Sequence, residues 1–295
     1  IAVDGKGWIT AVESGTFAGS AKTLDGPVLP GMPNLHSHAF QRAMAGLTER
    51  ATGGKDSFWT WREIMYGFLR KITPEDQEAI AAQLYVEMLK NGYTGVCEFH
   101  YLHHGIDGAA YSDRALASRH VIRAAQTAGI GITHLPVLYA HGGFGGQPPG
   151  AAQQRFINTP EQLARMIATL RRDNAGDDQI RIGLALHSLR AVGPEMVKEA
   201  VQAVTQDDPS APIHIHIAEQ VKEVEDCLAW CGKRPVEWLL DNAPVDARWC
   251  LVHATHMNEF ETAALAASGA VAGLCPTTEA NLGDGIFNLP AYLAQ

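Results

Sequence analysis

The stretch Pro30-Gly31-Met32-Pro33-Asn34-Leu35-His36-Ser37-His38 is a mostly apolar run that ends in two histidines separated by one residue. On a β-strand, side chains two residues apart project from the same face, so both imidazoles can reach one metal ion. Histidines also serve as hydrogen-bonded polar residues at strand ends, so this pair alone does not establish a metal site. The positions of the other histidines have to decide between these two interpretations.

The composition indicates an ordinary globular protein. The chain has 295 residues, 46% hydrophobic and 19% charged, which suits one α/β barrel or two smaller domains. Acidic residues outnumber basic ones by 32 to 23, and the net charge of −9 argues against a nucleic-acid partner. A membrane partner is not expected either, because no apolar run approaches the ~20 residues that a transmembrane helix needs.

Cysteine usage indicates the compartment. An odd number of scattered cysteines, mostly inside apolar runs, favours buried thiols over a disulfide framework and predicts a cytoplasmic protein. Cys227 and Cys231 lie four residues apart on a predicted helix, but no second pair completes a zinc site, so core packing is expected for both. The five cysteines are Cys97, Cys227, Cys231, Cys250 and Cys275.

Apolar runs bounded by turn signals alternate with helical patterns along most of the chain. Such alternation predicts parallel strands joined by right-handed helical crossovers, an architecture like that of a (β/α)8 barrel. The expected strands are 29–38, 93–101, 131–139, 181–189, 211–219, 248–256 and 270–278. The expected helices are 73–91, 113–128, 159–172, 194–206, 221–231 and 257–268.

Two other regions have their own character. Residues 1–28 are rich in glycine and short alternating segments, which predicts antiparallel strands of a small β-domain before a barrel domain at 29–295. The long connection 39–72 carries several aromatic residues, and an insertion of that size above a barrel strand is typical of a functional lid.

The histidines recur near the carboxyl ends of the expected strands. In barrels of this type, that rim is where active sites are built, so the metal interpretation of the first pair gains weight. The histidines in question are His36, His38, His100, His187, His214, His216, His253 and His256. We expect His256 to be a loop or helix-start residue.

The fifth expected strand adds a carboxylate to this rim. Glu219 stands three residues after His216, which suits a metal ligand with a nearby general acid/base. Alternatively, His214 and His216 pack inside the barrel and Glu219 caps the next helix. His253, at the end of the next strand, is placed to orient or deprotonate a metal-bound water.

The sequence resembles the amidohydrolase superfamily, whose members are metal-dependent hydrolases on a (β/α)8 barrel flanked by a small β-sandwich. Within it, the chain is similar to the formimidoylglutamate deiminase family over nearly its whole length. The H-x-H and H-x-x-E patterns are shared across the superfamily, whereas three stretches are more specific to the deiminases. These are HAFQRAMAGL at 38–47, FWTWRE at 58–63 and HSLRAV at 187–192.

The resemblance implies the roles of the site residues. His36, His38 and His216 would bind one zinc ion per subunit, although three histidines also suit another divalent metal. Glu219 would shuttle protons and His253 would polarise the attacking water. The substrate-binding residues would be Gln41, Arg62, Tyr101, His187 and Arg190. Taken singly, Arg62 and Arg190 also fit surface charges on helices.

The implied reaction is the hydrolysis of N-formimino-L-glutamate to N-formyl-L-glutamate and ammonia, a step of histidine degradation. A zinc-bound hydroxide would attack the formimino carbon while Glu219 moves a proton to the imino nitrogen. The partner would then be a small molecule with two carboxylates, which suits arginine because its guanidinium pairs carboxylates in a bidentate manner. We also expect a homodimer.

One departure from the family pattern concerns the carboxyl-terminal part. Members of the family continue into an eighth strand that ends in an aspartate metal ligand, and this sequence stops at Gln295, after the seventh expected strand. Asp284, in a Gly-Asp-Gly turn, offers no basis for replacing that ligand. Two alternatives stay open: a related deaminase acting on a ring amidine such as guanine, and a truncated, non-catalytic protein that binds metal and ligand without turnover.

Overall fold

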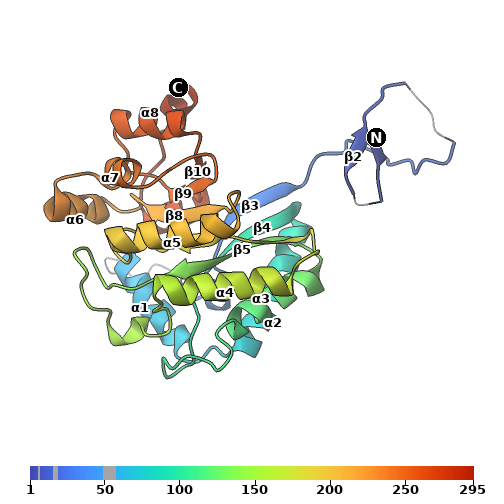
Figure 1. Ribbon diagram of the computed structural model, residues 1–295. Helices are drawn as coiled ribbons and strands as arrows, with labels where there is room; N and C mark the ends of the chain where they lie inside the picture. Colours follow the sequence, from blue (N-terminus) through green and yellow to red (C-terminus); the bar gives the residue numbers. More distant parts are fainter. Residues whose placement is uncertain (6, 16–18, 49–57) are drawn as a thin grey trace. The chain divides into compact units, whose positions relative to one another are not determined.

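The computed structural model describes residues 1–5, 7–15, 19–48 and 58–295 (Figure 1). The chain divides into two compact units, Ile1–Gly31 and Met32–Gln295. In the first unit, β1 (Ala2–Val3) pairs antiparallel with β2 (Ile9–Ala11). The β-sandwich expected around these strands remains a prediction.

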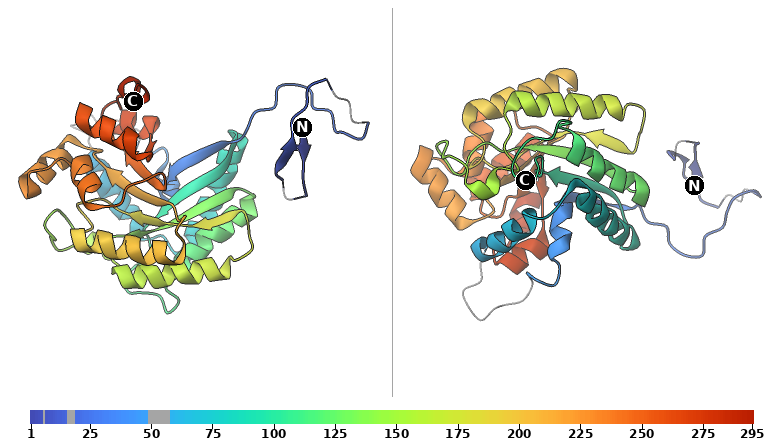
Figure 2. Two further views of the ribbon diagram at one scale, coloured as in Figure 1. Left: turned by 45° about the horizontal axis from the view of Figure 1, so that its top comes forward. Right: turned by 90° about the horizontal axis from the view of Figure 1, so that it is seen from below.

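The second unit is built on a parallel sheet whose strands lie in the order β3, β4, β5, β7, β8, β9 and β10. Every pairing between neighbours in this order is parallel. The sheet curls into a nearly closed barrel with helices around it (Figure 2, right), which confirms the predicted barrel class. Its strands are β3 Met32–Ser37, β4 Tyr93–His100, β5 Gly131–Leu138, β7 Leu184–Leu186, β8 Ile213–Ile217, β9 Trp249–His253 and β10 Val271–Gly273.

The fourth strand position is interrupted at Gly183. A short segment, β6 (Ile180–Ile182), pairs with the first half of β5, and β7 pairs with the end of β5 and with β8. A Cβ atom at Gly183 would lie 2.5 Å from the carbonyl oxygen of Pro212 and 2.7 Å from Leu135 Cδ2. Only glycine fits between these neighbours, so this residue allows the strand to cross from one partner to the next.

Local signals in the sequence set the helix ends. Before α2 (Pro74–Lys90), the side chains of Thr73 and Asp76 cap each other's backbone N–H, and Gly92 follows the helix at a φ of +87°. The remaining α-helices are α1 Phe58–Leu69, α3 Leu116–Ala128, α4 Pro160–Asp173, α5 Pro194–Asp207, α6 Val221–Cys231, α7 Pro235–Asn242, α8 Glu259–Ser268, α9 Pro276–Leu282 and α10 Leu289–Leu293. Two 3₁₀ helices, η1 Ala39–Met44 and η2 Ala151–Gln153, complete the described elements. None of the described helices is both long enough and apolar enough to traverse a lipid bilayer.

The parallel arrangement brings distant histidines to one end of the barrel. Because all the strands of the main sheet run the same way, the carboxyl ends of β3, β8 and β9 meet at one rim. His36, His216 and His253 are all within one residue of those ends. The fold therefore gathers at this rim residues that lie more than 200 positions apart in the sequence.

A second group of buried histidines does not line the cavity at this rim. The rings of His100 and His134 lie 5.1 Å apart, and His103 lies 5.4 Å from His100. His134 is fully buried, and among the described residues neither of its ring nitrogens has a hydrogen-bond partner. Burial lowers the pKa of both His103 and His134 to about 3. Both therefore stay neutral in the folded protein at neutral pH.

We expect the buried His134 to make the protein sensitive to acid. Its folded-state pKa of about 3 lies below the ordinary value of 6.5, so the unfolded chain binds the extra proton first as pH falls. Its contribution to stability is complete above pH 6.5 and is lost progressively between pH 6.5 and pH 3. Between pH 7 and pH 5, wild type should lose about 2 kcal/mol more unfolding free energy than His134→Leu, measured by urea denaturation. Equal losses in the two proteins would contradict this.

Candidate active site

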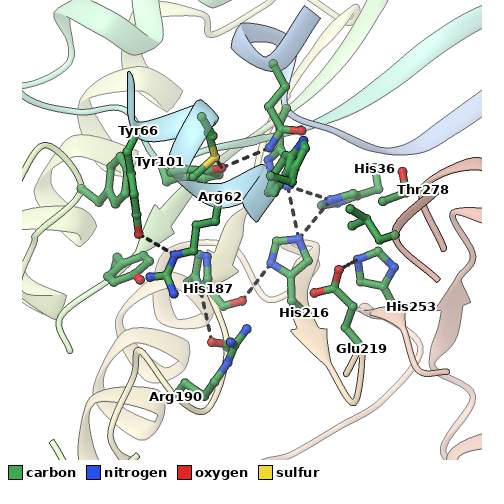
Figure 3. Close-up of a pocket in the computed structure, with 18 of the residues that line it drawn as sticks. His36, Arg62, Tyr66, Tyr101, His187, Arg190, His216, Glu219, His253 and Thr278 are labelled. Atoms are coloured by element: carbon green, nitrogen blue, oxygen red, sulfur yellow. Dashed lines mark hydrogen bonds and ion pairs between the residues drawn. The ribbon is translucent and has the colours of Figure 1, made fainter. Parts of the chain in front are cut away.

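Three imidazoles converge at the centre of the rim (Figure 3). His36 is in β3, His38 is the first residue after β3, and His216 is in β8. Their Nε2 atoms form a triangle with sides of 3.0 Å between His36 and His38, 3.1 Å between His36 and His216, and 3.3 Å between His38 and His216. The three predicted metal ligands therefore present one nitrogen each to a common point.

Backbone carbonyls fix which nitrogens carry protons. Nδ1 of His38 lies 2.9 Å from the carbonyl oxygen of Phe99, and Nδ1 of His216 lies 3.0 Å from that of His187. A carbonyl can only accept, so each Nδ1 donates its proton and each Nε2 keeps its lone pair. The two lone pairs then face each other across 3.3 Å, an arrangement that repels unless a cation lies between them.

The same histidines stay neutral, as metal ligands must be. Burial and the hydrogen bond to Phe99 together leave the pKa of His38 at about 4. Burial and neighbouring imidazoles also lower the pKa of His36 and His216 well below the ordinary value. The donor set therefore fits a divalent ion of the kind that imidazole binds.

Glu98 holds the backbone next to His38 in place, and the sequence analysis did not single this residue out. Its Oε1 accepts a 2.7 Å hydrogen bond from the backbone N–H of Ala39, directly after His38. Burial raises the pKa of Glu98 to about 7. An acidic residue between Cys97 and Phe99 in an otherwise apolar strand was the signal that could have identified it.

A carboxylate and a fourth histidine stand beside the triad. Oε1 of Glu219 lies 3.6 Å from Nε2 of His253, and both residues are buried. The ring of His253 stacks on that of His216 at 5.6 Å with an interplanar angle of 14°. Burial opposes a charge on His253, but the Glu219 carboxylate and hydrogen bonds to Cys275 and Glu279 raise its pKa well above the ordinary value.

The backbone at these strand ends is strained. Ala218, His253 and Ala254 have positive φ values of 51°, 70° and 48°. Left-handed conformations cost a residue with a Cβ roughly 1–2 kcal/mol, so the surroundings must hold them. Glu223 does so after β8, because its carboxylate accepts the backbone N–H of Ala218 at 3.1 Å and that of Glu219 at 3.2 Å. Sequence reasoning also missed Glu223.

All ten predicted site residues line one cavity of about 290 Å³. These are His36, His38, Gln41, Arg62, Tyr101, His187, Arg190, His216, Glu219 and His253. His100, His214 and His256 are not among the cavity-lining residues. The connection 39–72 contributes lining residues from η1 and α1, while its residues 49–57 lie outside the described part of the chain.

The cavity has two chemically different ends (Figure 3). In this view Glu219 and His253 lie to the right of His216, and Arg62 and Arg190 lie to its left. Arg62 donates from Nε to the hydroxyl of Tyr66 at 2.7 Å. Among the described residues, the buried Nε of Arg190 has no hydrogen-bond partner. One end of the cavity is therefore suited to proton transfer and the other to anionic groups.

Two of the remaining predicted residues bond to each other. Nε2 of Gln41 lies 3.3 Å from the hydroxyl of Tyr101, and both residues line the cavity. The α9 helix lines the opposite wall with Thr278, Asn281 and Leu282, which sequence reasoning did not single out. No spacing signal marked them, because only the folded barrel brings α9 over the cavity.

A second group of potential ligands lies behind His253. His253, Cys275 and Glu279 each offer one ligand atom, all within 4.8 Å of one another. Glu279 Oε1 lies 3.2 Å from His253 Nδ1 and accepts the backbone N–H of Cys275 at 3.0 Å. These groups satisfy each other through hydrogen bonds, whereas the Nε2 lone pairs of the triad do not. The triad is therefore the better metal site.

Comparison with known proteins supports the sequence resemblance. The sequence model of the Amidohydrolase family matches residues 28–295. The chain is 56% identical over 295 residues to a protein named formimidoylglutamate deiminase from Pseudomonas aeruginosa. This alignment covers 99% of the chain and 64% of the Pseudomonas protein, so the chain spans less than two thirds of that relative.

Solved structures agree on the fold. An amidohydrolase from Brucella melitensis superposes with a TM-score of 0.86 at 55% identity, covering 93% of this chain and 62% of the other. An adenosine deaminase from Xanthomonas campestris, solved with bound zinc, superposes with a TM-score of 0.72 at 21% identity. That match covers 90% of this chain and 53% of the other. At this lower identity it supports the fold alone.

We expect the triad to bind about one divalent ion per chain. Protein stripped with a chelator and reloaded with excess zinc should unfold roughly 10 °C higher than the stripped form, because the ion binds only the folded state. His216→Asn should lose both the bound zinc, measured by elemental analysis, and the thermal shift. Cys275→Ser is the matched control and should keep both. Loss of zinc in the Cys275→Ser protein instead would assign the ion to the second group.

Proposed function

Since this chain belongs to the amidohydrolase family, we propose that it hydrolyses N-formimino-L-glutamate to N-formyl-L-glutamate and ammonia, a step in histidine degradation. The observation that carries the proposal is the division of one cavity into an acid/base end and an end with two arginines. A linear substrate with an amidine at one end and two carboxylates at the other matches both. The 56% identity to a relative of that name supports the same substrate.

The proposed cofactor is one zinc ion held by His36, His38 and His216. The lone pairs that converge from these residues fit such an ion, and no organic cofactor is needed for hydrolysis. When bound, zinc lowers the pKa of a coordinated water to about 7 and so supplies a hydroxide nucleophile at neutral pH.

Glu219 is proposed to move protons between the water and the substrate. Its carboxylate lines the cavity beside the triad and has the buried setting in which a general base and acid operates. It would take a proton from the attacking water and deliver one to the imino nitrogen. The C–O bond would form as the π bond between the carbon and that nitrogen breaks, and the proton of the new hydroxyl group would then follow to the same nitrogen. The C–N bond would break with its electron pair going to nitrogen, so that ammonia leaves with both protons of the water as the C=O bond forms.

His253 is proposed to act on the same water from the neighbouring strand. Its Nε2 faces Glu219 at 3.6 Å, a gap that suits a bridging water better than a direct hydrogen bond. A ring held there can polarise the water while Glu219 carries the proton. Glu219 and His253 would therefore act on the same water from two neighbouring strands.

The arginine end is proposed to bind the two carboxylates of the substrate. Arg62 is oriented by Tyr66, and Arg190 follows β7 next to His187. Gln41, Tyr101 and His187 line the space between the arginines and the triad. A neutral ring amidine such as guanine offers no carboxylate to Arg190, whose buried Nε has no hydrogen-bond partner among the described residues, and this disfavours that alternative substrate.

The compartment proposed is the cytoplasm. All five cysteines of the chain are free thiols. Burial raises the pKa of Cys97 to about 11 and that of Cys250 to about 12. Such thiols are typical of a reducing environment.

The first test is ammonia release by the zinc-loaded protein from N-formimino-L-glutamate, with guanine as the parallel substrate. We expect turnover of the formimino compound only, and a loss of kcat of roughly 10²–10⁴-fold in Glu219→Gln, because the amide cannot take up a proton. Zinc content should be unchanged in this variant. Turnover of guanine, or an active Glu219→Gln protein, would contradict the proposal. Zinc binding without turnover of either substrate would favour the non-catalytic alternative.

A second test separates the two carboxylates. Arg190→Met should lower kcat/KM for N-formimino-L-glutamate by about 100-fold, because a substrate carboxylate loses its charged partner. The analogues N-formiminoglycine and 4-(formimino)aminobutyrate each keep one carboxylate. For the analogue that lacks the carboxylate bound by Arg190, the variant and wild type should be nearly equal.

The control for this test is Arg165→Met, on the outer face of α4, where the side chain is 77% exposed. It should behave as wild type with all three compounds. An equal loss with both analogues in Arg190→Met would show that Arg190 maintains the pocket without binding a carboxylate.

A further inference from the structure

The proposed reaction does not explain what holds the imidazole ring of His253 in its orientation. His253 closes β9 with a φ of 70°, and Ala254 follows at 48°. Two consecutive residues in a strained conformation do not orient a side chain by themselves, since strain persists only where other contacts impose it. The contacts of the imidazole ring must therefore fix its position.

One ring nitrogen of His253 faces a carboxylate outside the cavity. Nδ1 lies 3.2 Å from Oε1 of Glu279, a residue of α9 that is only 5% exposed. Glu279 does not line the cavity, whereas its helix neighbours Thr278 and Asn281 do. Glu279 is therefore placed to act on His253 without touching a bound substrate.

Glu279 is itself held in place. The same Oε1 accepts the backbone N–H of Cys275 at 3.0 Å, at the residue before α9 begins. This N–H can only donate, so the atom beside it must be an acceptor. The carboxylate oxygen is thereby fixed as an acceptor at the position that Nδ1 of His253 also reaches.

This arrangement selects one form of the imidazole. An ionised carboxylate oxygen only accepts hydrogen bonds, so Nδ1 of His253 must carry the proton. In the neutral ring, Nε2 then presents its lone pair toward Glu219 and the cavity. Without Glu279, the opposite form is favoured, since an N–H on Nε2 could donate to the Glu219 carboxylate and remove the lone pair from the cavity.

We propose that Glu279 is a positioning residue that holds His253 with its proton on Nδ1 and its Nε2 open to the cavity. The effect on rate rests on the proposed function, because only a reaction in the cavity uses Nε2. The effect on the imidazole does not depend on any substrate. The two can therefore be measured separately.

The test uses zinc-loaded protein carrying ¹⁵N-labelled histidine, with the His253 signals assigned from the His253→Gln spectrum. The groups around His253 raise its pKa, so the spectra are recorded at the high-pH end of a titration, where the ring is neutral. Under these conditions wild type should show the Nδ1–H form at His253. Glu279→Met, which keeps the size but removes the acceptor, should shift His253 to the Nε2–H form. Glu279→Gln should keep the Nδ1–H form, because the Cys275 N–H holds the amide oxygen in the same position.

We expect kcat to fall in the variant whose His253 signals change and to be largely kept in the variant whose signals do not. With N-formimino-L-glutamate, Glu279→Met should lose roughly 10- to 100-fold in kcat with little change in KM or zinc content, and Glu279→Gln should recover most of that loss. The control is Glu261→Gln, which removes a fully buried carboxylate that pairs with Arg234 and lies away from the ring. It should lower stability but leave the His253 signals as in wild type.

Several results would overturn the proposal. An Nε2–H form in wild type would do so without any variant, as would a Glu279→Met protein with unchanged His253 signals and unchanged kcat. If Glu279→Met does not fold, an Nε2–H form in Glu279→Gln would have the same meaning. Failure of the proposed function looks different: wild type would release no ammonia, while the spectra would still decide the role of Glu279.

Discussion

The candidate site depends on the convergence of three imidazole Nε2 atoms at one point. The lone pairs of two of these atoms are directed inward because backbone carbonyls of Phe99 and His187 take the Nδ1 protons of His38 and His216. Those carbonyls belong to β4 and to the residue after β7, so strand pairing sets the proton positions of the triad. A cation resolves the repulsion among these nitrogens, and the folded barrel keeps the histidines neutral through burial. The candidate metal site is therefore a consequence of how the sheet is assembled.

Buried carboxylates hold the rim around this point. Glu98 accepts the backbone N–H of Ala39, Glu223 accepts those of Ala218 and Glu219, and Glu279 accepts that of Cys275. Each N–H lies just past a strand end, where the sheet no longer supplies a partner. Burying a carboxylate is costly, and these hydrogen bonds offset part of that cost. The result is a rim on which strained residues and catalytic side chains keep fixed positions.

The cavity is organised by charge along its length. Glu219 and His253 lie on one side of His216 and the two arginines on the other, and Gln41, Tyr101 and His187 also line the cavity. Under the proposed function, a substrate with charge at one end would bind in a single direction, with its amidine at the proposed metal site. Recognition and chemistry are thus separated in space within one cavity.

The sequence by itself determined the barrel class and ten of the residues that line the cavity. The hydrophobic periodicity, the helix-capping residues and the glycine positions are local signals. The recurrence of His36, His216 and His253 at the ends of expected strands is also visible along the chain. The sequence could not identify Glu98, Glu223 and Glu279 as residues that hold the strand ends in place. It also could not show that Thr278 and Asn281 line the cavity. Glu98 accepts the backbone N–H of a residue 59 positions away, and Glu279 reaches a ring 26 positions away, so no spacing rule encodes these contacts. Glu223 and Glu279 also accept backbone N–H groups four or five positions earlier, but the sequence does not show that burial leaves those groups in need of a partner. Only the tertiary structure decided these contacts, because parallel pairing fixes which strand ends become neighbours and which polar groups burial forces together.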